Sequence, residues 1–207
     1  MSESTASPEE FAYAVGKYIY FRYLTRDDAL GDWHRWFNSP EVTRNLDRQK
    51  WLNTPEDQVA YWEHLQTSRE RLAVAIIDRT THKHIGIGSL SGIDPVNRRA
   101  EISLVIGSAA HRHGLHALEA VTLLTEIGLV RLNLHKLIAT GLTTSERGLR
   151  LNRLLGYTES GRYRENSFVE GEWVDNLILE IFQRDWLTSP RRPKTLAWTD
   201  SESAEPA

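Results

Sequence analysis

The chain has 207 residues and a formal net charge of −3, which suits one domain with a core of its own and gives no overall basic field for DNA. It contains no cysteine, which excludes disulfides and thiolate chemistry. No apolar stretch approaches the roughly 20 residues of a membrane span, and the polar start is unlike a signal peptide. We therefore expect a cytoplasmic protein that binds neither DNA nor a membrane.

Composition divides the chain into a central domain and two ends. Residues 1–16 and 187–207 are rich in Ser, Glu, Pro, Thr and Ala and lack the apolar side chains that would offset the entropy of ordering them. We expect both to be flexible tails. Residues 17–186 are expected to form a single domain.

The first elements of this domain are a strand and two helices. The aromatic and β-branched run KYIYFRYL (17–24) favours a strand. Thr25, with Asp28 three residues later, resembles a capping box and predicts a helix start. Thr54 before Pro55 predicts the start of the second helix, because threonine caps well and proline suits the first helical position.

The middle of the chain predicts an antiparallel meander. The runs 72–77, 85–93 and 100–107 are apolar and β-branched, with polar turns between them, as expected of three consecutive strands. A helix of about 14 residues with apolar residues along one side follows, and we expect it to end near Gly128.

The last third adds a strand, a helix and a hairpin. Residues 136–142 predict a strand, Ser145 can cap a short helix, and Gly156 suits the left-handed position after its end. Glu170-Gly171 separates two strand-like runs and predicts a hairpin turn. The order predicts an α+β domain with one mostly antiparallel sheet.

A histidine-rich turn, HRHGLH (111–116), joins the third meander strand to the long helix. One interpretation is an anion site, in which Gly114 and neighbouring amides face a phosphate while Arg112 and protonated imidazoles add charge. A solvated surface turn is the alternative. We expect no metal on His111, His113 and His116, because no Asp or Glu in the turn completes a ligand set and a helix N-terminus repels cations.

Several motifs together resemble the GNAT superfamily of N-acyltransferases, and most of all its RimJ and RimL branch of ribosomal-protein alanine acetyltransferases. They are FNSPEVTRNL (37–46), AEISLVIG (100–107), LNLHKL (132–137), LLGY (154–157) and VEGEWVDNLILEIF (169–182). The resemblance covers Tyr18 to Trp186. It implies an α+β fold with a single mixed, mostly antiparallel sheet, helices on both faces, and a central strand pair, 101–106 and 137–142, that splays apart.

The resemblance also implies a donor site for acetyl-CoA or another acyl-CoA, with the pantetheine arm between the splayed strands and the pyrophosphate on the turn. A strand amide near Val105 or Ile106 would polarise the donor carbonyl. The residues expected to bind the donor are Val105, Ile106, His111, Arg112, His113, Gly114, Leu115, His116, Ala117, Ser145 and Arg147. The chain departs from the family pattern with histidine at both signature ends of the turn, His111 and His116.

Two residues are candidates for catalysis. Glu101 begins the central strand and could help deprotonate the acceptor amine; an ion pair with Arg98 or Arg99 is the alternative. Asn152 stands where many members place a tyrosine that protonates the leaving thiolate, and asparagine is a poor acid, so either it or a water molecule would serve there.

Other side chains are candidates for substrate contact. The residues expected to bind the acceptor are Trp33, Tyr61, Asp94 and Trp173, although large aromatics at helical spacing are also typical of a core and the last two also suit structural turns or hairpins. Arg147, Arg150 and Arg153 recur every three residues. They suit either a ridge that contacts phosphates or an ordinary exposed cationic face.

These features predict an N-acyltransferase that moves an acyl group to a primary amine of a small molecule or a protein N-terminus by direct attack. One alternative keeps the fold and takes the acyl group from aminoacyl-tRNA. Another is a catalytically silent domain that binds a nucleotide or a partner protein. The expected partner is a small-molecule or peptide amine, with tRNA in the first alternative; whether the chain forms a homodimer stays open.

Overall fold

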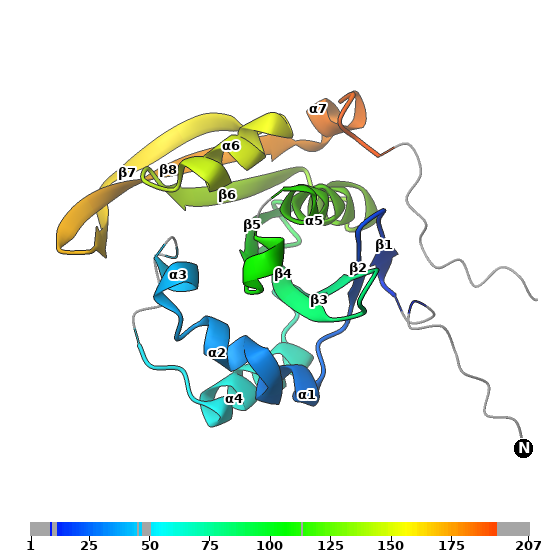
Figure 1. Cartoon of the computed structure of the whole chain (residues 1–207). Helices are drawn as coiled ribbons and strands as arrows, with labels where there is room; N and C mark the ends of the chain where they lie inside the picture. Colours follow the sequence, from blue (N-terminus) through cyan, green and yellow to red (C-terminus); the bar gives the residue numbers. More distant parts are fainter. Residues whose placement is uncertain (1–8, 10–11, 45, 47–50, 113, 194–207) are drawn as a thin grey trace, which may run out of the picture.

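A computed structural model of the chain describes residues 9, 12–44, 46, 51–112 and 114–193 and is built around one sheet (Figure 1). The sheet has eight strands in the order β1-β2-β3-β4-β5-β6-β8-β7. The strands are β1 (Ala14–Val15), β2 (Ile19–Arg22), β3 (Arg71–Asp78), β4 (His84–Asp94), β5 (Arg99–Ile106), β6 (Lys136–Leu142), β7 (Thr158–Val169) and β8 (Glu172–Phe182).

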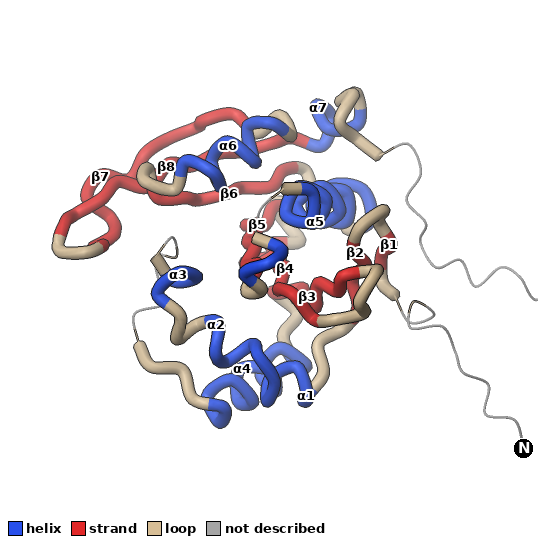
Figure 2. Tube along the Cα trace, in the orientation of Figure 1, coloured by secondary structure: helices blue, strands red, loops and turns tan. Residues whose placement is uncertain are grey.

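Helices and helical turns connect the strands, as Figure 2 shows. They are α1 (Arg26–Asp28), the π-helical η1 (Ala29–Trp33), α2 (His34–Trp36), α3 (Pro40–Thr43), α4 (Pro55–Thr67), the 3-10 turn η2 (Ala109–His111), α5 (Leu115–Glu126), the π-helical η3 (Ile127–Arg131), α6 (Glu146–Leu154) and α7 (Gln183–Leu187). None of these described helices is both long and apolar enough to cross a bilayer.

The sheet is antiparallel except at its centre, where β5 and β6 run parallel. Their pairing covers only Arg99↔Lys136, Ala100↔Leu137 and Glu101↔Ile138. Beyond Glu101, β5 keeps its partner β4 and β6 keeps its partner β8. The predicted fold class is therefore confirmed, including the splayed central strand pair.

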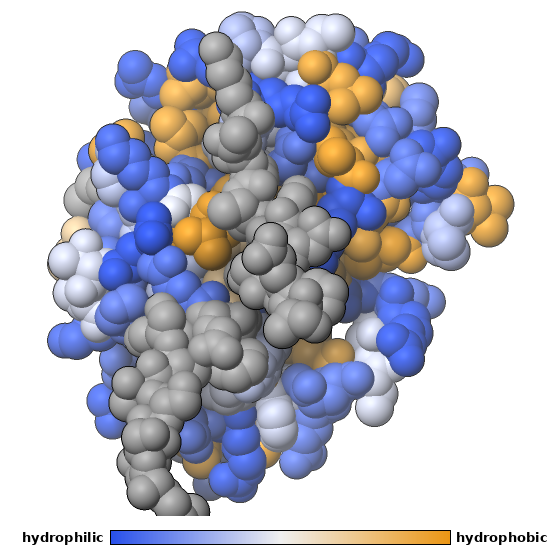
Figure 3. Space-filling view, turned by 90° about the vertical axis from the view of Figure 1, so that its right-hand side faces the viewer, coloured by the Kyte–Doolittle hydropathy of each residue, from blue (hydrophilic) through white to orange (hydrophobic). Residues whose placement is uncertain are grey.

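Two cores lie on opposite faces of the sheet because successive strand residues point to opposite sides. On β3, Val74 and Ile76 belong to the core beneath α5, whereas Ala75 and Ile77 belong to the core that includes Trp33 of η1. Figure 1 shows α5 on one side of the meander and the early helices α1, α2 and α4 on the other. On the face drawn in Figure 3, hydrophobic residues lie in patches separated by hydrophilic ones.

Packed structure extends beyond the predicted limits of 17 and 186 at both ends. At the N-terminal side β1 pairs with β2, and Ala14 is fully buried. At the other end the Arg192 guanidinium pairs with Glu126 at 2.9 Å. The sequence pattern missed these contacts because β1 has only two residues and because Arg192 pairs with a residue that lies 66 positions away in the chain.

The long helix ends later than predicted. Gly128 lies inside the π-helical continuation η3, which runs to Arg131. A Cβ at Gly128 would stand 2.9 Å from Leu137 and 3.2 Å from Leu90, so glycine is needed there for close packing on the sheet. The left-handed residue after the helix is Asn133. The predicted left-handed Gly156 and the turn at Glu170-Gly171 are confirmed by their positive φ angles.

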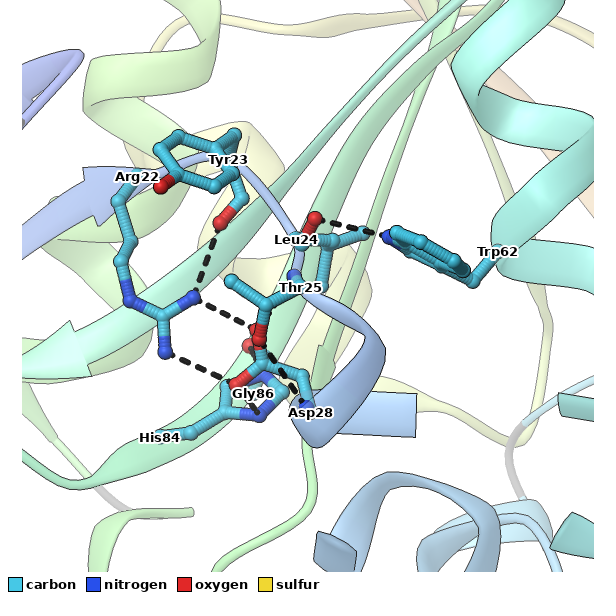
Figure 4. Close-up of polar contacts among 8 residues, drawn as sticks. All are labelled: Arg22, Tyr23, Leu24, Thr25, Asp28, Trp62, His84 and Gly86. Atoms are coloured by element: carbon cyan, nitrogen blue, oxygen red, sulfur yellow. Dashed lines mark hydrogen bonds and ion pairs between the residues drawn. The ribbon is translucent and has the colours of Figure 1, made fainter. Parts of the chain in front are cut away.

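Asp28 joins β2, α1 and β4 in one polar cluster (Figure 4). Its carboxylate accepts hydrogen bonds from Arg22 at 2.6 and 2.9 Å and from the Thr25 amide and hydroxyl at 2.8 Å each. The Nδ1 atom of His84 lies 3.2 Å from the same group. The predicted capping box of Thr25 and Asp28 is confirmed, and it also fixes the early helices to the sheet.

The pH dependence of stability should report this cluster. Burial disfavours the charged form, but the hydrogen bonds from Arg22 and His84 outweigh it, so the pKa of Asp28 lies well below its ordinary value of 3.8. A lowered carboxyl pKa stabilises the fold above the unfolded-state value, and that stabilisation is lost as the pH falls below it. In denaturant titrations, the stability difference between wild type and Asp28→Asn should begin to shrink as the pH falls below about 5 and shrink further below 3.8. A difference that does not change with acidification would contradict this account.

Candidate active site

The parting of β5 and β6 leaves one edge of β5 without a ladder partner. The open stretch runs from Glu101, the last paired residue, to Ile106 at the end of the strand. Five residues of strand at about 3.3 Å each span roughly 17 Å. Backbone amides on this unpaired edge, called the cleft edge of β5 below, can bind an extended group as a further strand would.

Strand alternation decides which amides of β5 face this cleft. The Gly107 amide donates to the Ile85 carbonyl of β4 at 3.0 Å, and the antiparallel register with β4 continues without interruption back from that point. Amides of successive residues point to opposite edges of a strand, so every second amide shares an edge. The Val105 amide therefore faces β4, and the Ile106 amide faces the cleft edge. Of the two amides predicted to donate a hydrogen bond to the acyl carbonyl, only that of Ile106 points to this edge.

The turn before α5 leaves the start of that helix open. Gly114 is the N-cap residue, with φ of 95°, and no side chain in the described part of the chain caps it. A Cβ on Gly114 would meet nothing within 4 Å. The first amides of α5, at Leu115, His116 and Ala117, therefore lie at an unshielded positive helix end, which favours an anion. His113 lies outside the described residues.

Arg112 is held by protein groups in this turn. Its Nη1 donates to Glu41 Oε2 of α3 at 2.7 Å and its Nη2 to the Gly107 carbonyl at 3.0 Å. Glu41 thus balances the positive charge that the sequence suggested for a phosphate. In this structure Arg112 chiefly anchors the turn to α3.

The two described histidines of the turn face a carboxylate. His116 Nε2 lies 3.1 Å and His111 Nε2 3.8 Å from Asp78 Oδ2, at the end of β3. In the sheet order β3 lies beyond β4, on the side of β5 away from β6. These imidazoles therefore point away from the cleft edge, toward a carboxylate that is supplied by a distant strand and not by the turn.

A cavity of about 360 Å³ lies at the other end of the open stretch of β5. Its lining residues are Arg71, Ser91, Gly92, Arg99, Ala100, Glu101 and Ile138. Glu101 is partly buried and stands where β5 and β6 begin to part. The structure thus places the predicted base beside a cavity at the far end of the cleft from the turn.

Two of the four predicted acceptor residues lie on the early helices. The Tyr61 hydroxyl accepts a hydrogen bond from Arg71 Nη1 at 2.8 Å, which connects α4 to the rim of this cavity. Trp33 is only 1% exposed and packs in the second core. A substrate contact at Trp33 is therefore not supported, because packing on the sheet places its side chain in the core.

The other two predicted acceptor residues have structural partners. Asp94 accepts hydrogen bonds from the Asn97 side chain at 2.6 Å and from the Asn97 and Val96 amides, and these hold the pKa of its carboxyl below the ordinary value. Trp173 is 62% exposed and packs against Phe168 across the β7–β8 hairpin, with ring centroids 5.2 Å apart. Neither residue lines the cavity beside Glu101.

The predicted site residues at helix α6 lie on different faces of the helix. Ser145, Gly148 and Asn152 are spaced by three and four residues and share one face. Arg150 and Arg153 belong to another, and they line a separate cavity of about 530 Å³ with Arg162 of β7. Arg147 is exposed. The predicted arginine ridge is thus divided, and only part of it borders a cavity.

Several polar residues near the cavity were missed from the sequence. Ser89 and Ser103 share a hydroxyl hydrogen bond of 2.8 Å between β4 and β5, and Ser91 lines the cavity. The available signal was alternation: small polar residues at every second position of otherwise apolar strands mark one polar face. Asp78 gave no such signal.

Comparisons with known proteins agree with this geometry. A family model described as "Acetyltransferase (GNAT) domain" matches residues 19–158. Spermidine N(1)-acetyltransferase of Escherichia coli (strain K12) is 27% identical over 175 residues, which cover 84% of this chain and 91% of that protein. An uncharacterized N-acetyltransferase, p20, of Bacillus licheniformis is 24% identical over 154 residues, covering 73% and 86%.

A solved structure has the same fold. The spermidine N-acetyltransferase of Vibrio cholerae, crystallised in complex with CoA and spermine, superposes with a TM-score of 0.77 at 20% identity, covering 83% of this chain and 99% of that one. At this identity the likeness shows the fold alone. None of these relatives supports the specific resemblance to ribosomal-protein alanine acetyltransferases.

Proposed function

Because the chain belongs to the GNAT acetyltransferase family, we propose that it transfers the acetyl group of acetyl-CoA to a primary amine of a small molecule. The observation that carries this proposal is the ladder between β5 and β6, which ends at Glu101 and leaves the β5 edge beyond it without a ladder partner. An uncapped helix N-terminus follows the far end of this edge, and a cavity lined by Glu101 lies at its near end.

The donor is proposed to lie along β5. Its pyrophosphate accepts hydrogen bonds from the first amides of α5 beyond Gly114, and the pantetheine arm extends along the open edge past the Ile106 amide. Because that arm separates the thioester from the phosphates, the carbonyl lies nearer to Glu101. The next cleft-facing amide by alternation is that of Leu104, which could polarise the carbonyl and stabilise the developing oxyanion.

The acceptor is proposed to enter the cavity beside Glu101. The Glu101 carboxylate removes a proton from the attacking ammonium, directly or through water, and the free amine attacks the carbonyl carbon. The departing thiolate takes its proton from water or through Asn152. Holding amine and thioester together in one cleft supplies much of the rate.

A polyamine is the first acceptor to test, because relatives at 27% identity over most of the chain are spermidine acetyltransferases. A second class is an amine that also carries an acidic group. Arg71 and Arg99 line the same cavity as Glu101, and this mixed charge suits a zwitterion better than a polycation.

Thiol release from acetyl-CoA tests the proposal. The chain has no cysteine, so a thiol reagent reports CoA without background from the protein. We expect acceptor-dependent release with spermidine or with an amino acid, and acetylated amine in the mass spectrum. No release with either class, despite binding of acetyl-CoA, would contradict the proposed function.

The Glu101→Gln variant should isolate the proton-transfer step. Since a positioned base contributes about 10²- to 10⁴-fold, kcat should fall at least about 100-fold while the Kd for acetyl-CoA stays unchanged. The acidic limb of the rate profile against pH should also disappear. A Ser91→Ala variant on the same cavity wall is the control, and an equal loss in both variants would argue against a base at Glu101.

The two other functions expected from the sequence find no support. The family and its relatives are acetyltransferases, which speaks against a silent domain. Nothing in them favours aminoacyl-tRNA as the donor.

A further inference from the structure

The side chains of Asp78, His111 and His116 meet at the end of β3 opposite the turn that opens α5. One ligand atom from each lies within 4.8 Å of the other two. The three come from two segments far apart in the sequence, and the proposed acetyl transfer uses none of these side chains. We propose that they bind a divalent transition-metal cation of the zinc type.

The carboxylate is oriented toward the histidines. Asp78 Oδ1 accepts hydrogen bonds from the amide and the hydroxyl of Thr81, both at 2.7 Å. This leaves Oδ2, which faces His116 at 3.1 Å and His111 at 3.8 Å. The Asp78 side chain is only 6% exposed, so its negative charge acts at short range on the two imidazoles that face it.

His111 is oriented from its far side. Its Nδ1 lies 2.8 Å from Ser108 Oγ. In the tautomer whose Nδ1–H donates to that hydroxyl, Nε2 carries the lone pair that a metal binds. Such an outer hydrogen bond is typical of histidine ligands. The His111 and His116 rings meet edge to face with centroids 4.9 Å apart, and the Nε2 atoms of both rings approach the same Asp78 oxygen.

The spacing approaches that of a tetrahedral site. Zinc bonds of about 2.0–2.1 Å place tetrahedral ligand atoms about 3.3 Å apart. The 3.1 Å separation between His116 and Asp78 already matches, and His111 needs a small side-chain rotation. Two histidines and a carboxylate suit zinc or cobalt and leave a fourth position for water. A bound cation would tie the turn to β3.

Zinc binding to the tag-free, full-length chain tests this site without acetyl-CoA, so its outcome is independent of the proposed function. After removal of metals with a chelator, the protein is titrated with Zn²⁺ in competition with a chromogenic chelator. We expect one Zn²⁺ per chain. Co²⁺ should give the visible absorption bands of a four- or five-coordinate ion.

Single-residue variants test whether Zn²⁺ binds at these three side chains. His111→Gln and His116→Gln should each weaken Zn²⁺ binding at least about 10-fold, and Ser108→Ala should weaken it less while all three ligands remain. His64→Gln, on the exposed face of α4, is the matched control and should bind as wild type does. Circular dichroism verifies the fold of each variant. The proposal would be overturned if His111→Gln and His116→Gln both bind Zn²⁺ as tightly as wild type does. It would also be overturned if the wild-type protein does not compete with the chelator for Zn²⁺.

Discussion

Replacing Gly114 with valine should raise the Kd for acetyl-CoA by about 100-fold or more. The space beside Gly114 is open, because a Cβ added there would have no neighbour within 4 Å, and it borders the amides proposed to bind the pyrophosphate. A branched side chain there would exclude the phosphate from two or more charge-assisted hydrogen bonds worth about 1.5–3 kcal/mol each. Calorimetric titration of both proteins with acetyl-CoA measures the loss.

Gly171 provides the matched control for this experiment. It also has a positive φ, 93°, and open space around its Cβ position, but it lies in the β7–β8 turn. Gly114→Val and Gly171→Val should therefore each lose about 1–3 kcal/mol of stability, because both glycines have a positive φ that a branched side chain disfavours. Only the first should lose donor binding. Equal affinity in both variants would place the phosphates away from this helix end.

Replacing Asp28 with alanine should cost about 3–5 kcal/mol of unfolding free energy, the largest loss that we expect from a single polar substitution here. The change removes the partner of Arg22, whose side chain is 24% exposed, and of His84, which is 12% exposed. Removing one member of a buried pair leaves the other charge uncompensated. Urea denaturation followed by tryptophan fluorescence measures the change.

A variant at Asp57 distinguishes the stability contributed by a capping box from that contributed by an ion pair. Thr54 and Asp57 form the same kind of capping box at the start of α4, but its hydrogen bonds are exposed, and no guanidinium in the described part of the chain pairs with Asp57 as Arg22 pairs with Asp28. Asp57→Ala should cost about 1 kcal/mol. A similar cost for Asp28→Ala would mean that Arg22 and His84 add nothing to the cap.

Local signals in the sequence were sufficient for much of the fold. Both capping boxes, Thr25 with Asp28 and Thr54 with Asp57, involve residues three apart, so neighbouring residues alone determine them. The Glu170-Gly171 turn likewise depends on backbone freedom at the position itself. Strand alternation and the order of the elements predicted one mostly antiparallel sheet, and the family resemblance added its mixed character and its parted centre, which the structure confirms.

Other features depend on contacts between distant segments. Gly128 continues the helix because Leu137 and Leu90 pack against it, although glycine commonly ends a helix. Trp33 has the spacing of a residue that could face either a core or a cleft, and packing on the sheet placed it in the core. Periodicity reports that a face is apolar and does not report what covers it.

The sequence by itself determined the family resemblance, the caps, the turns and the position of Glu101 on the central strand, because these follow from residues close together in the chain. Only the tertiary structure decided that Asp78 meets His111 and His116, that Glu41 holds Arg112, and which amides of β5 face the cleft. These depend on strand register and on the placement of helices over the sheet. Both are set by long-range packing, whose partners leave no pattern in the local sequence.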